Sequence, residues 1–162
     1  MTSYWSLSSD KTGGVSILQD PTKHDSAPWH PKLWTKRILT VLVEGVLVVR
    51  VYAPNDRQER ENFFSELRRW PWPDTAMILF GDFYCVQNPH LDRLGGSRSG
   101  RPENPALTML LQALDLEDAI TLAGAAMEDE VTDLTDYYTF WTARSASRID
   151  RFYKPTTSNA AI

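Results

Sequence analysis

The apolar and polar positions of this chain change period along its length, which predicts short strands interleaved with helices. Residues 13–18, GGVSIL, fit a strand that leaves a glycine turn. Residues 37–54 hold two β-branched runs separated by Glu44-Gly45, the pattern of a hairpin. Residues 76–83 form an almost continuously apolar run, as expected of a strand covered on both faces. Two aromatic-rich strands are also predicted, in residues 137–143 and 147–155.

Two other segments repeat at the spacing of a helix. Residues 56–70 place apolar side chains three and four positions apart, with Arg and Glu between them, before a proline ends the pattern. A second helix is predicted to begin near Asn104 and Pro105, and its leucines are Leu107, Leu110, Leu111 and Leu114. Residues 19–34 are predicted to be a loop, and the polar loop of residues 88–104 is too long for a passive connection. Strands interleaved with helices predict an α/β sandwich.

Size and composition fit one soluble domain. The chain has 162 residues, 42% of them hydrophobic, which is enough to bury a core. A formal net charge of -4 gives no general attraction to nucleic acid, so such a partner would need a local basic patch. Arginines do cluster, although we expect most of them to belong to an ordinary solvated surface. The clusters are Arg57, Arg60, Arg68 and Arg69; Arg93, Arg98 and Arg101; and Arg144, Arg148 and Arg151.

Cysteine content and targeting signals favour an intracellular protein. Cys85 is the only cysteine, which excludes an internal disulfide, and its apolar neighbours predict a buried thiol rather than a nucleophile. No stretch has the roughly 18 apolar residues of a membrane span, and residues 1–14 lack the pattern of a signal peptide. We therefore expect a protein of the nucleus or cytoplasm with no membrane partner.

Two aspartates at the ends of apolar strands are the first candidates for chemistry. Asp82 follows Gly81 where α/β proteins place functional groups, although a turn or helix-capping aspartate would look the same. Asp150 in SRIDRF repeats the arrangement, and an ion-paired strand residue is its alternative. In that segment we expect Ile149 and Phe152 to face the core.

A third strand ends in VYAPN, where Pro54 stops the hydrogen-bonded ladder. The hydroxyl of Tyr52 and the amide of Asn55 suit phosphate oxygens. Core packing explains a tyrosine beside a proline equally well, so the pattern alone leaves both interpretations open.

The motifs VYAPN, a helix with paired phenylalanines, ILFGDF, a loop with LDR, YTFW and SRIDRF follow one another in this order. This order resembles the endonuclease/exonuclease/phosphatase superfamily. The chain is most similar to the apurinic-type endonuclease domain of non-LTR, LINE-like retrotransposons, from about Trp5 to Tyr153.

The resemblance implies a four-layered, DNase I-like α/β sandwich that hydrolyses phosphodiester bonds with Mg²⁺ or Mn²⁺. Asp82 matches the aspartate that handles the attacking water, Tyr52 matches a phosphate-binding tyrosine, and Asp150 matches an aspartate that orients a catalytic histidine. The remaining matched positions, expected beside the substrate, are Asn55, Tyr84, Arg93, Thr139 and Arg148. DNA is the implied partner, and a parent polyprotein would carry a reverse transcriptase.

Three departures from the family pattern bear on activity. Tyr84 stands where the family has an asparagine, and a phenol cannot reproduce the paired contacts of an amide. The family's asparagine and metal-binding glutamate of the first strands have no counterpart, and the closing Ser-Asp-His strand is missing, so residues 1–162 are expected to form a single incomplete domain. His24, His30 and His90 match no motif and are predicted to lie on surface loops. The protein ligands of a metal are therefore unassigned.

Three hypotheses follow from these observations. The first is a metal-dependent DNA endonuclease of impaired activity, and lipid or nucleotide phosphoesters are alternative substrates by chemistry. The second is a non-catalytic nucleic-acid-binding remnant, or inactive pseudo-enzyme, that uses the arginine-rich loop of residues 93–101. The third is a poorly stable fragment, because a sandwich that lacks strands exposes ladder groups.

Overall fold

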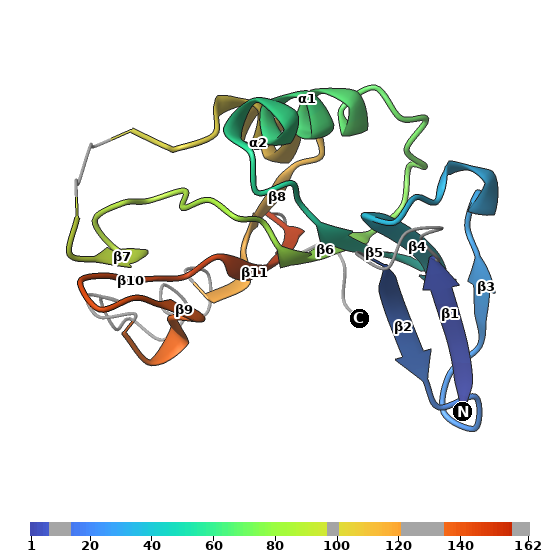
Figure 1. Cartoon of the computed structure of the whole chain (residues 1–162). Coiled ribbons are helices and arrows are strands. Elements are labelled where there is room, and N and C mark those ends of the chain that lie inside the picture. The colour runs from blue at the N-terminus through green and yellow to red at the C-terminus, as the bar shows by residue number, and fades with distance from the viewer. Residues whose placement is uncertain (7–13, 97–100, 121–134, 157–162) are drawn as a thin grey trace.

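A six-stranded sheet forms the centre of the protein in the computed structural model, which describes residues 1–6, 14–96, 101–120 and 135–156 (Figure 1). The strands lie in the order β3 (Ser26–Pro28), β4 (Ile38–Val43), β5 (Val46–Tyr52), β6 (Met77–Asp82), β11 (Asp150–Pro155) and β8 (Leu116–Asp118). β5 and β6 run parallel, and the other neighbouring strands are antiparallel. The predicted hairpin of β4 and β5 and the predicted strand β6 are confirmed.

Two helices, α1 (Arg57–Leu67) and α2 (Pro105–Ala113), pack side by side on one face of this sheet (Figure 1). Each begins at a capping side chain, since Asp56 accepts a hydrogen bond from the Glu59 amide and Asn104 accepts one from the Leu107 amide. The main core lies between helices and sheet, and its large members include Leu47, Phe64, Leu79, Leu107, Leu110 and Tyr153. Both predicted helices are confirmed, with α1 ending at Leu67.

The opposite face of the sheet is covered over β4 and β5 by an antiparallel pair, β1 (Thr2–Ser6) and β2 (Val15–Gln19) (Figure 1). Val15 joins Leu39 and Val41 there in a second, smaller core. Sequence predicts β2 but not β1, because TSYWS has no aliphatic run to mark a strand. Helices, large sheet and this pair form successive layers of the predicted α/β sandwich.

A three-stranded sheet extends from one end of the large sheet (Figure 1). Its order is β7 (Arg93–Leu94), β10 (Ala146–Ser147) and β9 (Phe140–Trp141), so the strand predicted in residues 137–143 is reduced to two residues. The predicted loop of residues 19–34 contains β3 and a 3₁₀ turn, Pro31–Leu33. Another 3₁₀ turn, Thr135–Tyr137, precedes β9. Among the described residues, no helix is long and apolar enough to cross a membrane.

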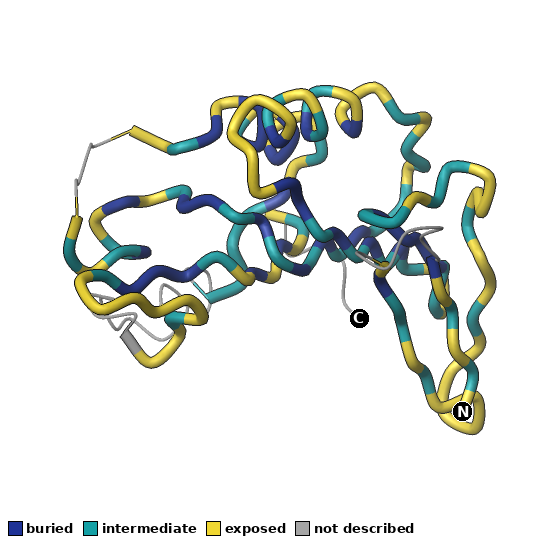
Figure 2. Tube along the Cα trace, viewed as in Figure 1, coloured by how far each residue is buried: buried dark blue, intermediate teal, exposed yellow. Residues whose placement is uncertain are grey.

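The burial of residues 148–152 corrects the sequence prediction. Figure 2 shows buried positions along the central strands and on the helices that cover them. Phe152 is 56% exposed and Ile149 is half-buried, whereas Arg148 and Arg151 are 2% and 3% exposed. The expectation that Ile149 and Phe152 face the core is therefore wrong. The two arginines lie inside because buried carboxylates neutralise them, as described below.

Candidate active site

Three polar side chains lie in one row at the ends of three neighbouring strands of the large sheet. Tyr52 ends β5 opposite Asp82 at the end of β6, and Asp82 lies opposite Asp150 at the start of β11. Because residues paired in register project to the same face of a sheet, the three side chains share the face that the helices do not cover. Positions separated by 68 and 30 residues along the chain thereby become neighbours, since Asp150 follows Asp82 by 68 residues and Asp82 follows Tyr52 by 30.

Gly81 explains how Asp82 comes so close to β5. Its φ is +137°, and a Cβ on this residue would lie 1.9 Å from the carbonyl oxygen of Val51. Only glycine combines this backbone conformation with so close an approach of the neighbouring strand. The side chain of Asp82, the next residue, binds the backbone that follows it: Oδ1 of Asp82 accepts a hydrogen bond of 3.0 Å from the amide of Tyr84.

The carboxylate of Asp82 is poised to titrate near neutrality. Burial raises the pKa of Asp82 to about 6, and the negative charge of Asp150 adds to this effect. The Tyr84 amide and the positive charges of Arg50 and Arg60 oppose the rise. At pH 7 the group is therefore mostly ionised, yet it is far more basic than an ordinary aspartate.

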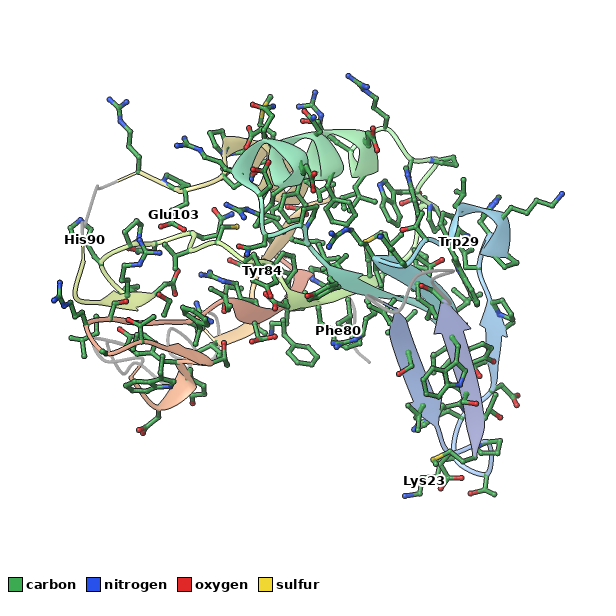
Figure 3. All side chains as sticks on the ribbon, viewed as in Figure 1. Lys23, Trp29, Phe80, Tyr84, His90 and Glu103 are labelled. Atoms are coloured by element: carbon green, nitrogen blue, oxygen red, sulfur yellow. The ribbon has the colours of Figure 1, made fainter. Side chains whose placement is uncertain are left out.

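Two tyrosines stand beside this carboxylate. The hydroxyls of Tyr52 and Tyr84 are 3.5 Å apart, and their rings meet edge to face with centroids 5.8 Å apart. Tyr84 has a left-handed backbone, with φ +50°, and lies near the middle of the molecule in Figure 3. The hydrogen bond with Tyr52, followed by burial and the charge of Asp82, raises the pKa of Tyr84 to about 12. Its phenol therefore stays protonated at neutral pH and is a hydrogen-bond donor.

A pocket of about 450 Å³ opens next to the tyrosines, and Asn55, Tyr84, Arg93 and Ser147 are among its lining residues. Asn55 is exposed in the turn after β5. Nη1 of the buried Arg60 donates to the carbonyls of Asn55 and Pro54, at 2.7 and 3.1 Å, and so holds this turn. Arg60 was not predicted as a site residue, because its role depends on main-chain acceptors that no side-chain motif reveals.

Arg93 lines the same pocket with its charge already engaged. Its guanidinium forms an ion pair with Glu103, and its Nε donates to Oγ of Ser147 at 3.4 Å. Glu103 also accepts a hydrogen bond of 3.1 Å from the amide of Val86. The structure thus brings Arg93 to the pocket, but as half of an ion pair that a phosphate would have to share.

Thr139 supports Asp150 through the main chain. Its Oγ1 accepts hydrogen bonds from the amides of Ile149 and Asp150, at 3.3 and 3.2 Å. The amide of Phe83 donates to the carbonyl of Ile149 at 2.8 Å, which continues the junction of β6 with β11. Thr139 is therefore placed to fix the backbone that carries Asp150.

The guanidinium of Arg148 is held by two carboxylates. These are Asp92, at 2.8 Å, and Asp118, at 2.7 Å. A buried guanidinium held by two carboxylates is not placed to bind a phosphate, so direct substrate binding by Arg148 does not fit this geometry. Asp92 is another residue that sequence reasoning did not assign, although it is the middle residue of the LDR segment.

The protein donors do not complete a metal site. The described part of the chain contains no group of three or more His, Cys, Asp or Glu side chains placed to hold an ion. His24, His30 and His90 are exposed in loops, as predicted, and Figure 3 shows His90 far from Tyr84. Asp82 and Asp150 are left as two adjacent carboxylates, which do not fit a site that holds Mg²⁺ without further oxygen ligands.

Solved structures of other proteins have a fold similar to that of this chain. No family model and no curated protein matches the sequence. Among solved structures, a 3′-5′ exonuclease (NExo) from Neisseria meningitidis is 18% identical, with a TM-score of 0.60, and the match covers 94% of this chain and 67% of that one. An AP endonuclease from Archaeoglobus fulgidus is 16% identical, also with a TM-score of 0.60, over 94% of this chain and 65% of that one.

A truncated TDP2 from Caenorhabditis elegans is similar as well, at 15% identity and a TM-score of 0.52, over 96% of this chain and 62% of that one. The chain thus spans about two thirds of the length of the structures it matches. At these identities the likeness concerns the fold. The protein has a DNase I-like α/β fold, as predicted from the sequence, and its neighbours of that fold are an exonuclease and an AP endonuclease.

Proposed function

We propose that this chain is a nucleic-acid phosphodiesterase module in which Asp82 accepts the proton of the attacking water. The observation that carries this proposal is the row of Tyr52, Asp82 and Asp150, in which a carboxylate with a pKa near 6 stands beside two phenol donors. A general base works best when its pKa is close to the working pH, because it must be ionised and still basic.

In the proposed reaction, a water molecule hydrolyses a phosphodiester bond. A water oxygen bonds to phosphorus, its proton passes to a carboxylate oxygen of Asp82, and the bond from phosphorus to the leaving oxygen breaks with its electron pair. The leaving oxygen takes a proton from solvent. The hydroxyls of Tyr52 and Tyr84 and the amide of Asn55 donate hydrogen bonds to the other phosphate oxygens. Burial raises the pKa of Asp82, and the negative charge of Asp150 adds to this rise.

We propose DNA as the substrate of this module. We also propose that the chain itself originates from a LINE-like retroelement. Support comes from the motif order and from the structural neighbours, one of which is described as bound to a product DNA hairpin. A requirement for Mg²⁺ or Mn²⁺, and a parent chain with a reverse transcriptase, remain predictions from the resemblance. In the described part of the chain, Asp82 and Asp150 would need further oxygen ligands to hold such an ion.

The test is nicking of supercoiled plasmid by the purified chain with Mg²⁺, with Mn²⁺ and with a chelator. The variants are Asp82→Asn, which removes the base while keeping the side-chain shape, and Tyr84→Asn, which restores the residue of the resembled family. We expect nicking by the wild type, more by Tyr84→Asn, and none by Asp82→Asn. Equal nicking by the wild type and Asp82→Asn would overturn the assignment of the base.

A second function, non-catalytic nucleic-acid binding, is favoured by one observation: the described residues supply only two carboxylates at the site. In this case a DNA duplex would bind with an affinity that falls steeply with salt, and Asp82→Asn would not change it. Fluorescence anisotropy of a labelled duplex at several salt concentrations separates the two functions, since only the enzyme also cleaves the duplex.

A further inference from the structure

A cluster of four charges, three of them buried, surrounds the segment that carries Asp150. Oδ1 of Asp92 accepts hydrogen bonds from Nε and Nη2 of Arg148, at 3.0 and 2.8 Å, and Oδ2 accepts one of 2.7 Å from Arg151. The carboxylate of Asp118 accepts hydrogen bonds from Nη2 and Nη1 of Arg148, at 2.7 and 3.1 Å. Its Oδ2 lies 3.6 Å from Nη1 of Arg151. Asp92 is fully buried, and two positive charges balance two negative ones.

Asp92 differs from Asp118 because it also binds the loop that follows β6. Its Oδ2 accepts hydrogen bonds from the amides of Gln87 and Asn88, at 3.2 and 2.8 Å. Its main-chain amide donates to the carbonyl of Asn88 at 2.7 Å, and its carbonyl accepts the amide of Arg148 at 2.9 Å. One residue therefore joins the loop of residues 83–92 to the segment of residues 148–151.

These two segments carry the two sides of the candidate site. Tyr84 lies three residues before Gln87 in the loop, and Asp150 lies between the two arginines that Asp92 holds. We propose that Asp92 is a positioning residue that sets the distance of Asp150 from Asp82 and Tyr84. This inference rests on the proposed function, because it assumes that the row of Tyr52, Asp82 and Asp150 is the reacting centre.

A merely stabilising role explains these contacts less well. Buried ion pairs contribute little net stability compared with apolar side chains of the same volume, because desolvation offsets their attraction. Burial alone would raise the pKa of Asp92, but Arg151 and Arg148 hold it below its ordinary range, so the carboxylate is ionised. An ionised group that accepts two guanidinium groups and two loop amides fixes geometry in several directions at once.

Asp92→Asn tests the role, with Asp118→Asn as the matched control. Both changes remove one negative charge from the same pair of arginines and set an NH₂ group against a guanidinium. Only Asp92→Asn alters a side chain that also accepts the loop amides of Gln87 and Asn88. We expect Asp92→Asn to lower kcat for nicking about a hundredfold at unchanged KM, as expected for a misplaced reacting group, and Asp118→Asn to lower it by less than about threefold. Equal losses in both variants would overturn the proposal.

A second readout does not depend on catalysis. In the wild type the Tyr84 amide is bonded to Asp82, so its NMR shift should follow the titration of Asp82 with a midpoint near pH 6. We expect this response to be lost in Asp92→Asn and retained in Asp118→Asn. A chain that never nicks DNA would refute the proposed function and still allow this comparison.

If Asp92→Asn does not fold, a charge-balanced double variant tests the positioning role of Asp92 instead. Asp92→Asn with Arg151→Gln removes one charge of each sign and leaves Arg148 paired with Asp118. We expect this variant to fold and to lose the pH response of the Tyr84 amide. A folded double variant with the wild-type response at Tyr84 and the wild-type amide shift of Asp150 would overturn the positioning role.

Discussion

Asp82→Asn should make the fold more stable at alkaline pH while it abolishes nicking. Asparagine keeps the shape and an oxygen that can accept the Tyr84 amide, but it carries no charge. Moving a carboxyl pKa from 3.8 to about 6 corresponds to at most about 3 kcal/mol, at about 1.4 kcal/mol per pKa unit. Since the group is only half-buried, solvent screening reduces this to about 1 kcal/mol.

The pH dependence of this effect has a definite sign. The pKa of Asp82 is higher in the folded state than in the unfolded chain, so the folded state binds the proton more tightly. The wild type therefore has the full contribution of this group below about pH 4 and loses it as the pH rises through 6. The neutral variant loses nothing over that range, so its advantage in free energy of unfolding should grow by about 1 kcal/mol between pH 4 and pH 8.

Urea denaturation followed by tryptophan fluorescence measures this difference, since the chain has six tryptophans. Asp74→Asn is the control, because Asp74 is exposed in the loop before β6 and its change removes a charge without removing a buried carboxylate. We expect no comparable pH trend in the control. A pH-independent difference for Asp82→Asn, or one that grows toward acid pH, would show that the carboxylate is not held in a raised-pKa environment.

Three further predictions concern single residues. Gly81→Ala should lower the free energy of unfolding by at least about 3 kcal/mol in urea denaturation, because its Cβ would meet the Val51 carbonyl, whereas Gly45→Ala, at φ +82° with no atom within 4 Å, should cost about 1 kcal/mol. Equal losses would mean that backbone strain alone matters. Burial raises the pKa of Cys85 to about 12, so a thiol reagent at pH 8 should label the native chain at least about a hundredfold more slowly than the urea-unfolded chain, and equal rates would contradict its burial. Tyr84→Phe keeps the ring and removes the hydroxyl, so KM for plasmid nicking should rise about tenfold, and an unchanged KM would exclude a phosphate contact by this phenol.

Local sequence patterns were sufficient for the central elements. The β-branched runs around Glu44-Gly45 predict β4 and β5, and the three- and four-residue spacing predicts both helices, because these patterns reflect the buried face of each element. β3 was missed, because its three residues lie in a proline-rich segment that pairs only with distant β4.

Long-range charge pairing was the main feature that the sequence did not reveal. Arg148 and Arg151 look like solvated strand residues, and the prediction placed Ile149 and Phe152 inside instead. The partner that reverses this burial, Asp92, lies 56 residues before Arg148 in the sequence. Nothing local marks such a pair, so the inward face of this strand could be assigned only from the structure.

The candidate site shows what the sequence motifs predict and what they miss. The motif order names Tyr52, Asp82 and Asp150, and the structure brings these three into one row of the sheet. The same reasoning predicts substrate binding by Arg148, whose guanidinium the structure pairs with Asp92 and Asp118, and it does not predict the main-chain contacts of Arg60. Motifs identify side chains that point at a site more readily than those that hold its backbone.

The most direct test of the account is the rate of plasmid nicking by the wild-type chain as a function of pH, with excess enzyme and fixed Mg²⁺. If Asp82 is the base, the rate rises with pH, has its midpoint near 6 and levels off above it, and Asp82→Asn shows no such activity. A rate that is independent of pH between 5 and 8, or nicking that persists in Asp82→Asn, would contradict the assignment of Asp82.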